Sequence, residues 1–141
     1  VGEWVNLGAL TTTSDLKNTY GQIKVPLQGK EVDTCAIKVG SFIADHSKTG
    51  IGTLLDAGCM IGVACNVFGG GIAPRYIPSF SWGGKDGFME NKLDKAAKVA
   101  ELAMKRREVK QTQIDRDLLE KVYELTALER KKNFGRKEMS P

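Results

Sequence analysis

Aliphatic and small side chains recur every six residues between Val39 and Phe68. This segment divides into the hexads VGSFIA, DHSKTG, IGTLLD, AGCMIG and VACNVF. The fifth place is mostly aliphatic: Ile43, Thr49, Leu55, Ile61 and Val67. The second place is mostly small: Gly40, His46, Gly52, Gly58 and Ala64. An α-helix repeats every 3.6 residues and a strand every two, so a strict period of six predicts a solenoid with one hexad on each of three flat faces.

The start of the chain fits the same template, because VGEWVN and LGALTT place Gly2 and Gly8 second in their hexads. We expect the first and fifth places to point inward and the second to lie at tight bends. An antiparallel β domain with glycine turns is the alternative.

A long insertion is predicted between the two blocks of hexads. The spacing from Leu7 to Val39 is not a multiple of six, so residues 13–38 leave the solenoid as a loop or rejoin it in a shifted register. Loops this long are often functional. Within it, the alternation at Ile23-Lys24-Val25 before Pro26 predicts a short strand.

The sequence changes character after GGGIAPRYIPSFSWGG and becomes rich in Lys, Glu, Ala and Leu. We expect two units, a mainly β solenoid over 1–84 and a helical appendage over 85–141. One helix is predicted from an N-cap at Asn91, and a second follows Thr112 and ends at Gly135. The predicted buried positions are Leu93, Ala97, Ala100 and Met104 in the first helix, and Ile114, Leu118, Val122 and Leu125 in the second.

Charge is concentrated in the appendage. Residues 1–84 carry six basic and six acidic side chains, whereas the remainder carries fifteen and eleven, which accounts for the net charge of +4. Basic and acidic residues alternate there, which favours solvated, packing or oligomerising helices over a nucleic-acid partner. No apolar run approaches the roughly 20 residues of a membrane span. We therefore expect a cytoplasmic protein with no membrane partner, and, because the chain opens within a hexad and without Met, a fragment of a longer protein.

The cysteines and tryptophans are expected to be structural. Cys35, Cys59 and Cys65 show no C-x-x-C spacing and only one histidine accompanies them, so no metal site is predicted. Cys59 and Cys65 are expected to be small buried residues. Trp4 is expected to face outward against the insertion or a neighbouring subunit. Trp82, beside Phe80, is expected to cover the open end of the solenoid.

The segments VGEWVNLGALTTTSDLK, IKVPLQGKEVDT and VGSFIADHSKTGIG resemble a known family. They are similar to the C-terminal left-handed parallel β-helix of bifunctional sugar-1-phosphate nucleotidylyltransferase/acetyltransferases. That resemblance implies acetyl transfer from acetyl-CoA to the amine of a hexosamine 1-phosphate, at sites between the subunits of a homotrimer. It also implies that any Mg²⁺ belongs to a nucleotidylyltransferase domain preceding this chain.

The resemblance assigns expected roles to individual residues. Asn6 would bind the amino sugar, and the backbone at Ala9 would meet acetyl-CoA. Ser47 would lie near the thioester, with Cys65 one coil further on. Phosphate groups would be met by Lys17, Lys24 or Lys48, and the adenine end of CoA by Arg75 and Tyr76.

The catalytic base is expected outside the sequence in hand. In the family it is a histidine on a coil that precedes the Asn6 hexad, so it would lie upstream of Val1. His46 occupies a different hexad and is expected to be an outward or hydrogen-bonded imidazole. An alternative function follows, in which the solenoid is a non-catalytic trimerisation or regulatory domain of a sugar-1-phosphate nucleotidylyltransferase. The departures from the family pattern at Leu10, Asp15 and Leu16 favour it.

Overall fold

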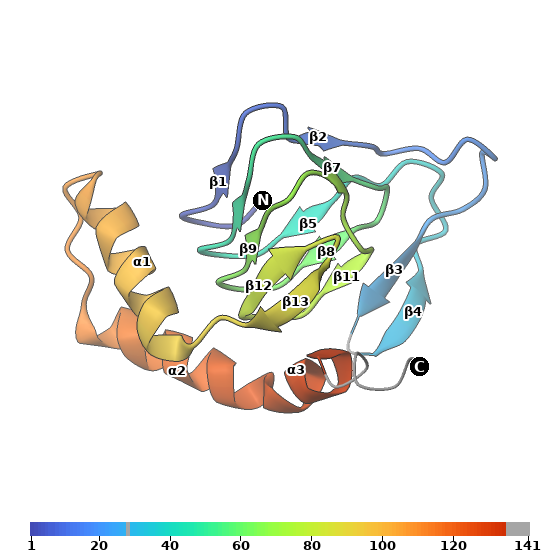
Figure 1. Ribbon diagram of the computed structural model, residues 1–141. Helices are drawn as coiled ribbons and strands as arrows, with labels where there is room; N and C mark the ends of the chain where they lie inside the picture. Colours follow the sequence, from blue (N-terminus) through green and yellow to red (C-terminus); the bar gives the residue numbers. More distant parts are fainter. Residues whose placement is uncertain (28, 135–141) are drawn as a thin grey trace.

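Three parallel sheets stacked from short strands form the body of the molecule. The computed structural model describes residues 1–27 and 29–134. The strands of the body are β1 (Asn6–Leu7), β2 (Thr12–Thr13), β5 (Phe42–Ile43), β6 (Lys48–Thr49), β7 (Thr53–Leu55), β8 (Met60–Ile61), β9 (Asn66–Val67), β10 (Gly71–Ile72), β11 (Tyr76–Ile77) and β12 (Ser81–Gly84). We call these ten strands the three-sheet stack (Figure 1).

From β5 to β12 the chain visits the three sheets in strict rotation. The sheets have the orders β1-β6-β9-β12, β2-β7-β10 and β5-β8-β11. Lys48 pairs with Asn66, and Phe42 with Met60, so each turn advances 18 residues. That advance is three hexads, and the predicted period therefore corresponds to one strand on each face.

The fifth hexad place points into the stack, as predicted. Ile43, Thr49, Leu55, Ile61 and Val67 are all buried, and the four aliphatic residues among them belong to one apolar cluster. The prediction for the first place was wrong. Ile51 is 73% exposed, whereas the third-place residues Ser47, Thr53, Cys59 and Cys65 are buried. Side chains alternate along a strand, so the third place shares the inner face with the fifth.

The opening residues stack on the later turns in a register different from the predicted one. Asn6 pairs with Lys48, an offset of 42, which brings Trp4 level with His46 and Leu10 level with Gly52. All four have positive φ, between 57° and 71°, and they form corners of the stack. The corner residues of the first turn are thus Trp4 and Leu10, not Gly2 and Gly8.

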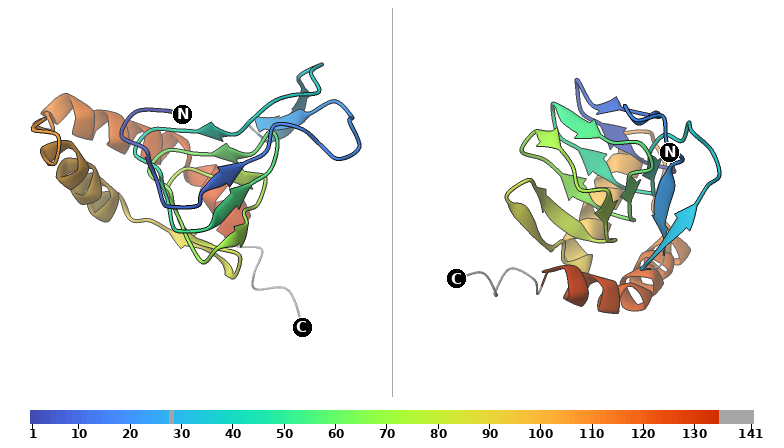
Figure 2. Two further views of the ribbon diagram at one scale, coloured as in Figure 1. Left: turned by 90° about the horizontal axis from the view of Figure 1, so that it is seen from above. Right: turned by 90° about the vertical axis from the view of Figure 1, so that its right-hand side faces the viewer.

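The insertion carries a β-hairpin, made of β3 (Lys24–Leu27) and β4 (Lys30–Asp33). This confirms the strand predicted around Val25. Ile23 and Val25 are buried against the backbone at Gly58, where an added Cβ would lie 2.7 Å from the Ile23 side chain. The hairpin lies on one side of the stack and the helices α1 and α2 on the opposite side (Figure 2).

Strand β13 (Gly87–Glu90) pairs antiparallel with β12 and covers that edge of the sheet. Trp82 had been expected to provide this cover, but it is 38% exposed and packs edge-on against Phe68. Phe80 is fully buried beneath Tyr123, in an edge-on ring contact of 4.9 Å. Backbone pairing by β13, together with helix packing, therefore closes this end.

Three helices follow, where two had been predicted: α1 (Leu93–Lys105), α2 (Gln113–Leu125) and α3 (Ala127–Phe134). The chain leaves helical geometry at Thr126, whose hydroxyl donates to the Val122 carbonyl. Gly135 lies outside the described residues. Strands and helices contribute about equal numbers of residues, so the described chain is mixed α/β, not mainly β.

The helix packing differs in detail from the predicted stripes. Lys92, not Asn91, is the N-cap of α1, and the Asn91 side chain instead donates to the Ala64 carbonyl, which ties the appendage to the stack. In α2 the buried residue is Leu119. Four apolar residues of α2 and α3 are largely exposed: Ile114, Leu118, Leu125 and Leu128.

Candidate functional site

A row of polar side chains crosses the outer face of the β1-β6-β9 sheet. Asn6, Lys48 and Asn66 are in-register neighbours on adjacent parallel strands. The residues that follow Lys48 and Asn66 point inward and are buried, so these side chains point outward. We call these three residues the polar row. It places two amides on either side of a single cation.

Lys48 is the most constrained member of the polar row. Its side chain is half-buried, and Nζ donates to the His46 carbonyl at 2.9 Å. Burial lowers the pKa of this ammonium, because desolvation penalises its charged form. A half-buried ammonium has given up part of its hydration and is suited to bind phosphate oxygens or a carbonyl.

Ser47 and Cys65 lie together, but inside the stack. Ser47 is fully buried, and its Oγ donates to the Gly62 carbonyl at 2.5 Å and accepts the N–H of Cys65 at 3.0 Å. Burial raises the pKa of the Cys65 thiol to about 11. Neither side chain faces solvent, so contact with a CoA thioester would require the core to open.

Ala9 and Lys17 lie away from the polar row. Ala9 is exposed next to the Leu10 corner, and its carbonyl accepts the N–H of Gly52 at 2.9 Å. Lys17 lies in the insertion, where Nζ donates to the Gln22 carbonyl at 2.8 Å. Lys17 also lines a pocket of about 310 Å³ with Arg75, and the polar side chains of this pocket include Ser14, Asn18, Thr19 and Asp56.

Arg75 and Tyr76 hold the fold together in this arrangement. The Arg75 guanidinium pairs with Glu31 at 3.2 Å and also donates to the Lys24 carbonyl, which fixes the hairpin to the stack. The Tyr76 hydroxyl donates to Glu129 of α3 at 2.7 Å. Burial, followed by that hydrogen bond, raises the pKa of Tyr76. Lys24 is exposed on β3.

His46 lies at a corner of the stack, two residues before Lys48. Its Nδ1 is buried and has no hydrogen-bond partner within the described part of the chain. Burial, and then the charge of Lys48, lower the pKa of this imidazole below its usual 6.5. The expected hydrogen-bonded imidazole is therefore not present, and the side chain is a half-buried, largely neutral base.

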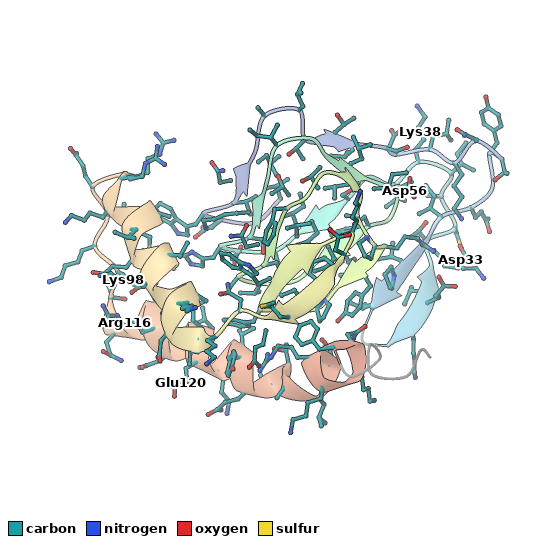
Figure 3. The ribbon with its side chains drawn as sticks, viewed as in Figure 1. Asp33, Lys38, Asp56, Lys98, Arg116 and Glu120 are labelled. Carbon is teal, nitrogen blue, oxygen red and sulfur yellow. The ribbon has the colours of Figure 1, made fainter. Side chains whose placement is uncertain are left out.

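Charged side chains at the two ends of the molecule are well separated. Asp33, Lys38 and Asp56 lie on the hairpin side, whereas Lys98, Arg116 and Glu120 lie on α1 and α2 (Figure 3). Within residues 1–27 and 29–134, no group of three His, Cys, Asp or Glu residues is placed to bind a metal ion. None of the described helices is long and apolar enough to cross a membrane.

Sequence reasoning identified Asn6 and Lys48 but missed two features. Asn66 completes the polar row and could have been found by adding one turn of 18 residues to Lys48. The surroundings of His46 include Asp115 of α2, which lies 69 positions further along the sequence. No local pattern could have revealed that neighbour.

The stacked parallel sheets and the polar row define a protein built from repeated turns, with its candidate site on an outer face. The chain is similar to a bifunctional sugar-1-phosphate nucleotidylyltransferase/acetyltransferase of Sulfurisphaera tokodaii, with 32% identity over 77 residues. The matched segment covers 55% of this chain and 19% of that relative. No protein-family model matches the sequence.

Proposed function

We propose that this chain is the acetyltransferase part of a sugar-phosphate nucleotidylyltransferase, with the three-sheet stack as a left-handed parallel β-helix. It would transfer the acetyl group of acetyl-CoA to the amine of a hexosamine 1-phosphate. The polar row carries the proposal, because it places the Asn6 amide next to a half-buried cation on an exposed sheet face. The similarity to a relative with both activities in its name supports it.

The reaction requires a proton acceptor for the attacking ammonium and donors for the oxyanion formed at the thioester carbon. In the proposal, Asn6 orients the amino sugar and Lys48 meets a phosphate group. Backbone groups at Ala9 contact acetyl-CoA. The base comes from a histidine that precedes Val1 in the parent protein, as the resemblance implies.

Asn6 and Lys17 belong to different faces of one chain, since β1 and β2 lie in different sheets. A site shared between subunits would bring the polar row of one chain toward the insertion of the next. We therefore propose a homotrimer, a closed arrangement that would also cover apolar outer positions. Leu10, Ile51 and Ile72 are each more than 60% exposed in the single chain.

One observation favours a second candidate, a non-catalytic trimerisation or regulatory domain. Ser47 and Cys65, the residues assigned to the thioester, are enclosed in the core. In this alternative the apolar outer positions mediate assembly, and the polar row has no substrate.

Calorimetric titration with acetyl-CoA and desulfo-CoA distinguishes the two functions. The acetyltransferase proposal predicts saturable binding in the micromolar range, weakened in Lys48→Gln but not in Lys30→Gln, a matched change on the exposed hairpin strand β4. Absence of binding by a protein verified as a trimer would overturn the proposal in favour of the second candidate. Sedimentation showing a monomer at high concentration would contradict the trimer.

A further inference from the structure

A cavity of about 210 Å³ lies between one corner of the three-sheet stack and helix α2. Trp4 and His46 contribute its aromatic side chains from two successive turns, and Leu118 and Val122 contribute apolar surface from α2. We call it the corner cavity. On the lower turns the same corner is occupied by Ala64 and Phe80, which pack under α1 and α2. The cavity therefore occupies the part of this corner that the helices do not fill.

Three carboxylates also line the corner cavity, from Glu3, Asp45 and Asp115. Asp45 and Asp115 each use one oxygen locally: Asp45 Oδ1 accepts the N–H of Glu3 at 2.7 Å, and Asp115 Oδ2 accepts from Thr112. The described residues that line the cavity include no Lys or Arg. The wall is therefore apolar and aromatic, and its charge is negative.

His46 does not offset this charge at neutral pH. Burial and the nearby Lys48 ammonium disfavour its protonation and outweigh the opposite influence of Asp45, Asp115 and Glu3. The imidazole is therefore mostly neutral at pH 7. It presents a polar, uncharged surface within an acidic cavity.

We propose that the corner cavity binds a small organic cation, a primary ammonium on an apolar body. The ammonium would lie between Glu3 and Asp115, where opposite charge and partial burial both favour it. The apolar body would pack on the Trp4 ring and Leu118, and the ring face would add a cation–π attraction. This assignment is independent of acetyl transfer, because it uses no member of the polar row.

The single histidine makes the test direct, because the aromatic carbon–proton NMR spectrum of the protein contains one imidazole spin system. The probes are phenethylammonium, the uncharged 2-phenylethanol and the anionic phenylacetate, each titrated at pH 7.5. We expect saturable shifts of the His46 signals with phenethylammonium and much weaker effects with the other two. Binding of the cation should also lower the pH at which His46 titrates, since the two positive charges oppose each other.

Glu3→Gln removes one wall charge without removing a hydrogen bond given for that side chain. It should weaken phenethylammonium binding about threefold, the order expected for a partly exposed ion pair. Glu120→Gln, on the outer surface of α2, is the matched control and should leave the affinity unchanged. Backbone amide spectra verify that both variants are folded.

Three results would overturn the inference. Equal affinity for phenethylammonium and 2-phenylethanol would show a merely apolar cavity. Unchanged His46 signals at saturating phenethylammonium would show that no binding occurs there. Equal affinities of the Glu3→Gln and Glu120→Gln variants would show that the wall charge is irrelevant. Each can occur whether or not acetyl-CoA binds, so the two proposals fail independently.

Discussion

Replacing Gly62 by alanine tests the close stacking of successive turns. A Cβ at Gly62 would lie 2.6 Å from the Oγ of Ser79 and 2.7 Å from its Cα. Carbon atoms in contact are normally about 3.5–4.0 Å apart, so the Ser79 backbone would have to move by roughly 1 Å. Two hydrogen bonds resist that movement: Gly62 N–H to the Ile77 carbonyl at 2.9 Å, and Val63 N–H to Ser79 Oγ at 3.0 Å.

The expected cost combines overpacking with weakened hydrogen bonding. Overpacking of a tight core typically costs about 1–3 kcal/mol, and one weakened hydrogen bond adds about 1 kcal/mol. We therefore expect Gly62→Ala to lose about 2–4 kcal/mol of unfolding free energy. In a chain of this size that corresponds to a melting temperature lower by roughly 10 °C.

Gly40→Ala is the matched control, because a Cβ there would meet no atom within 4 Å and the φ is not left-handed. It should leave stability unchanged or raise it by a few tenths of a kcal/mol, roughly, through the unfolded chain. Urea and thermal unfolding, followed by circular dichroism, measure both variants. Equal midpoints for Gly62→Ala and Gly40→Ala would refute the stacking geometry.

Three further predictions concern titratable and charged groups. Only Cys35 should react rapidly with a thiol reagent at pH 8, because Cys59 and Cys65 are buried and burial raises the pKa of each to about 11; three fast thiols in the native protein would contradict this. Since the pKa of His46 is lowered in the folded state, the unfolded state binds the proton more tightly below about pH 6.5, and stability should fall with pH there. His46→Gln should show a shallower loss between pH 7 and 5 than the wild type. Arg130→Gln should cost about 2 kcal/mol, because the 3% exposed guanidinium bonds Glu90 at 2.9 Å and stacks on a tyrosine ring; an unchanged urea midpoint would exclude that role.

The hexad period predicted the parallel stacking because it is a local property that repeats. One turn of 18 residues follows directly from three hexads, and the fifth place is buried in every hexad from Ile43 to Val67. Assignment of the first place failed at Ile51. The period does not say which second position shares the inner face, and alternation along the strand selects the third.

The helices and the corner cavity were less predictable. Any of several apolar stripes on α2 could have been buried, and contact with Phe80 and Ala64 selected Leu119 and left Leu118 at the cavity. The cavity itself arises where Trp4 and Asp115, far apart in sequence, face each other. Such a site depends on helix docking, which periodicity within either segment does not encode.

The central claim is that the polar row binds acetyl-CoA and an amino sugar phosphate. A crystal structure of the protein soaked with acetyl-CoA and a hexosamine 1-phosphate tests it most directly. The account predicts the sugar at Asn6, a phosphate group within hydrogen-bond distance of Lys48 Nζ, and the insertion of a neighbouring subunit against the same face. Both ligands bound on another surface, or an empty polar row in crystals that diffract well enough to show them, would contradict it.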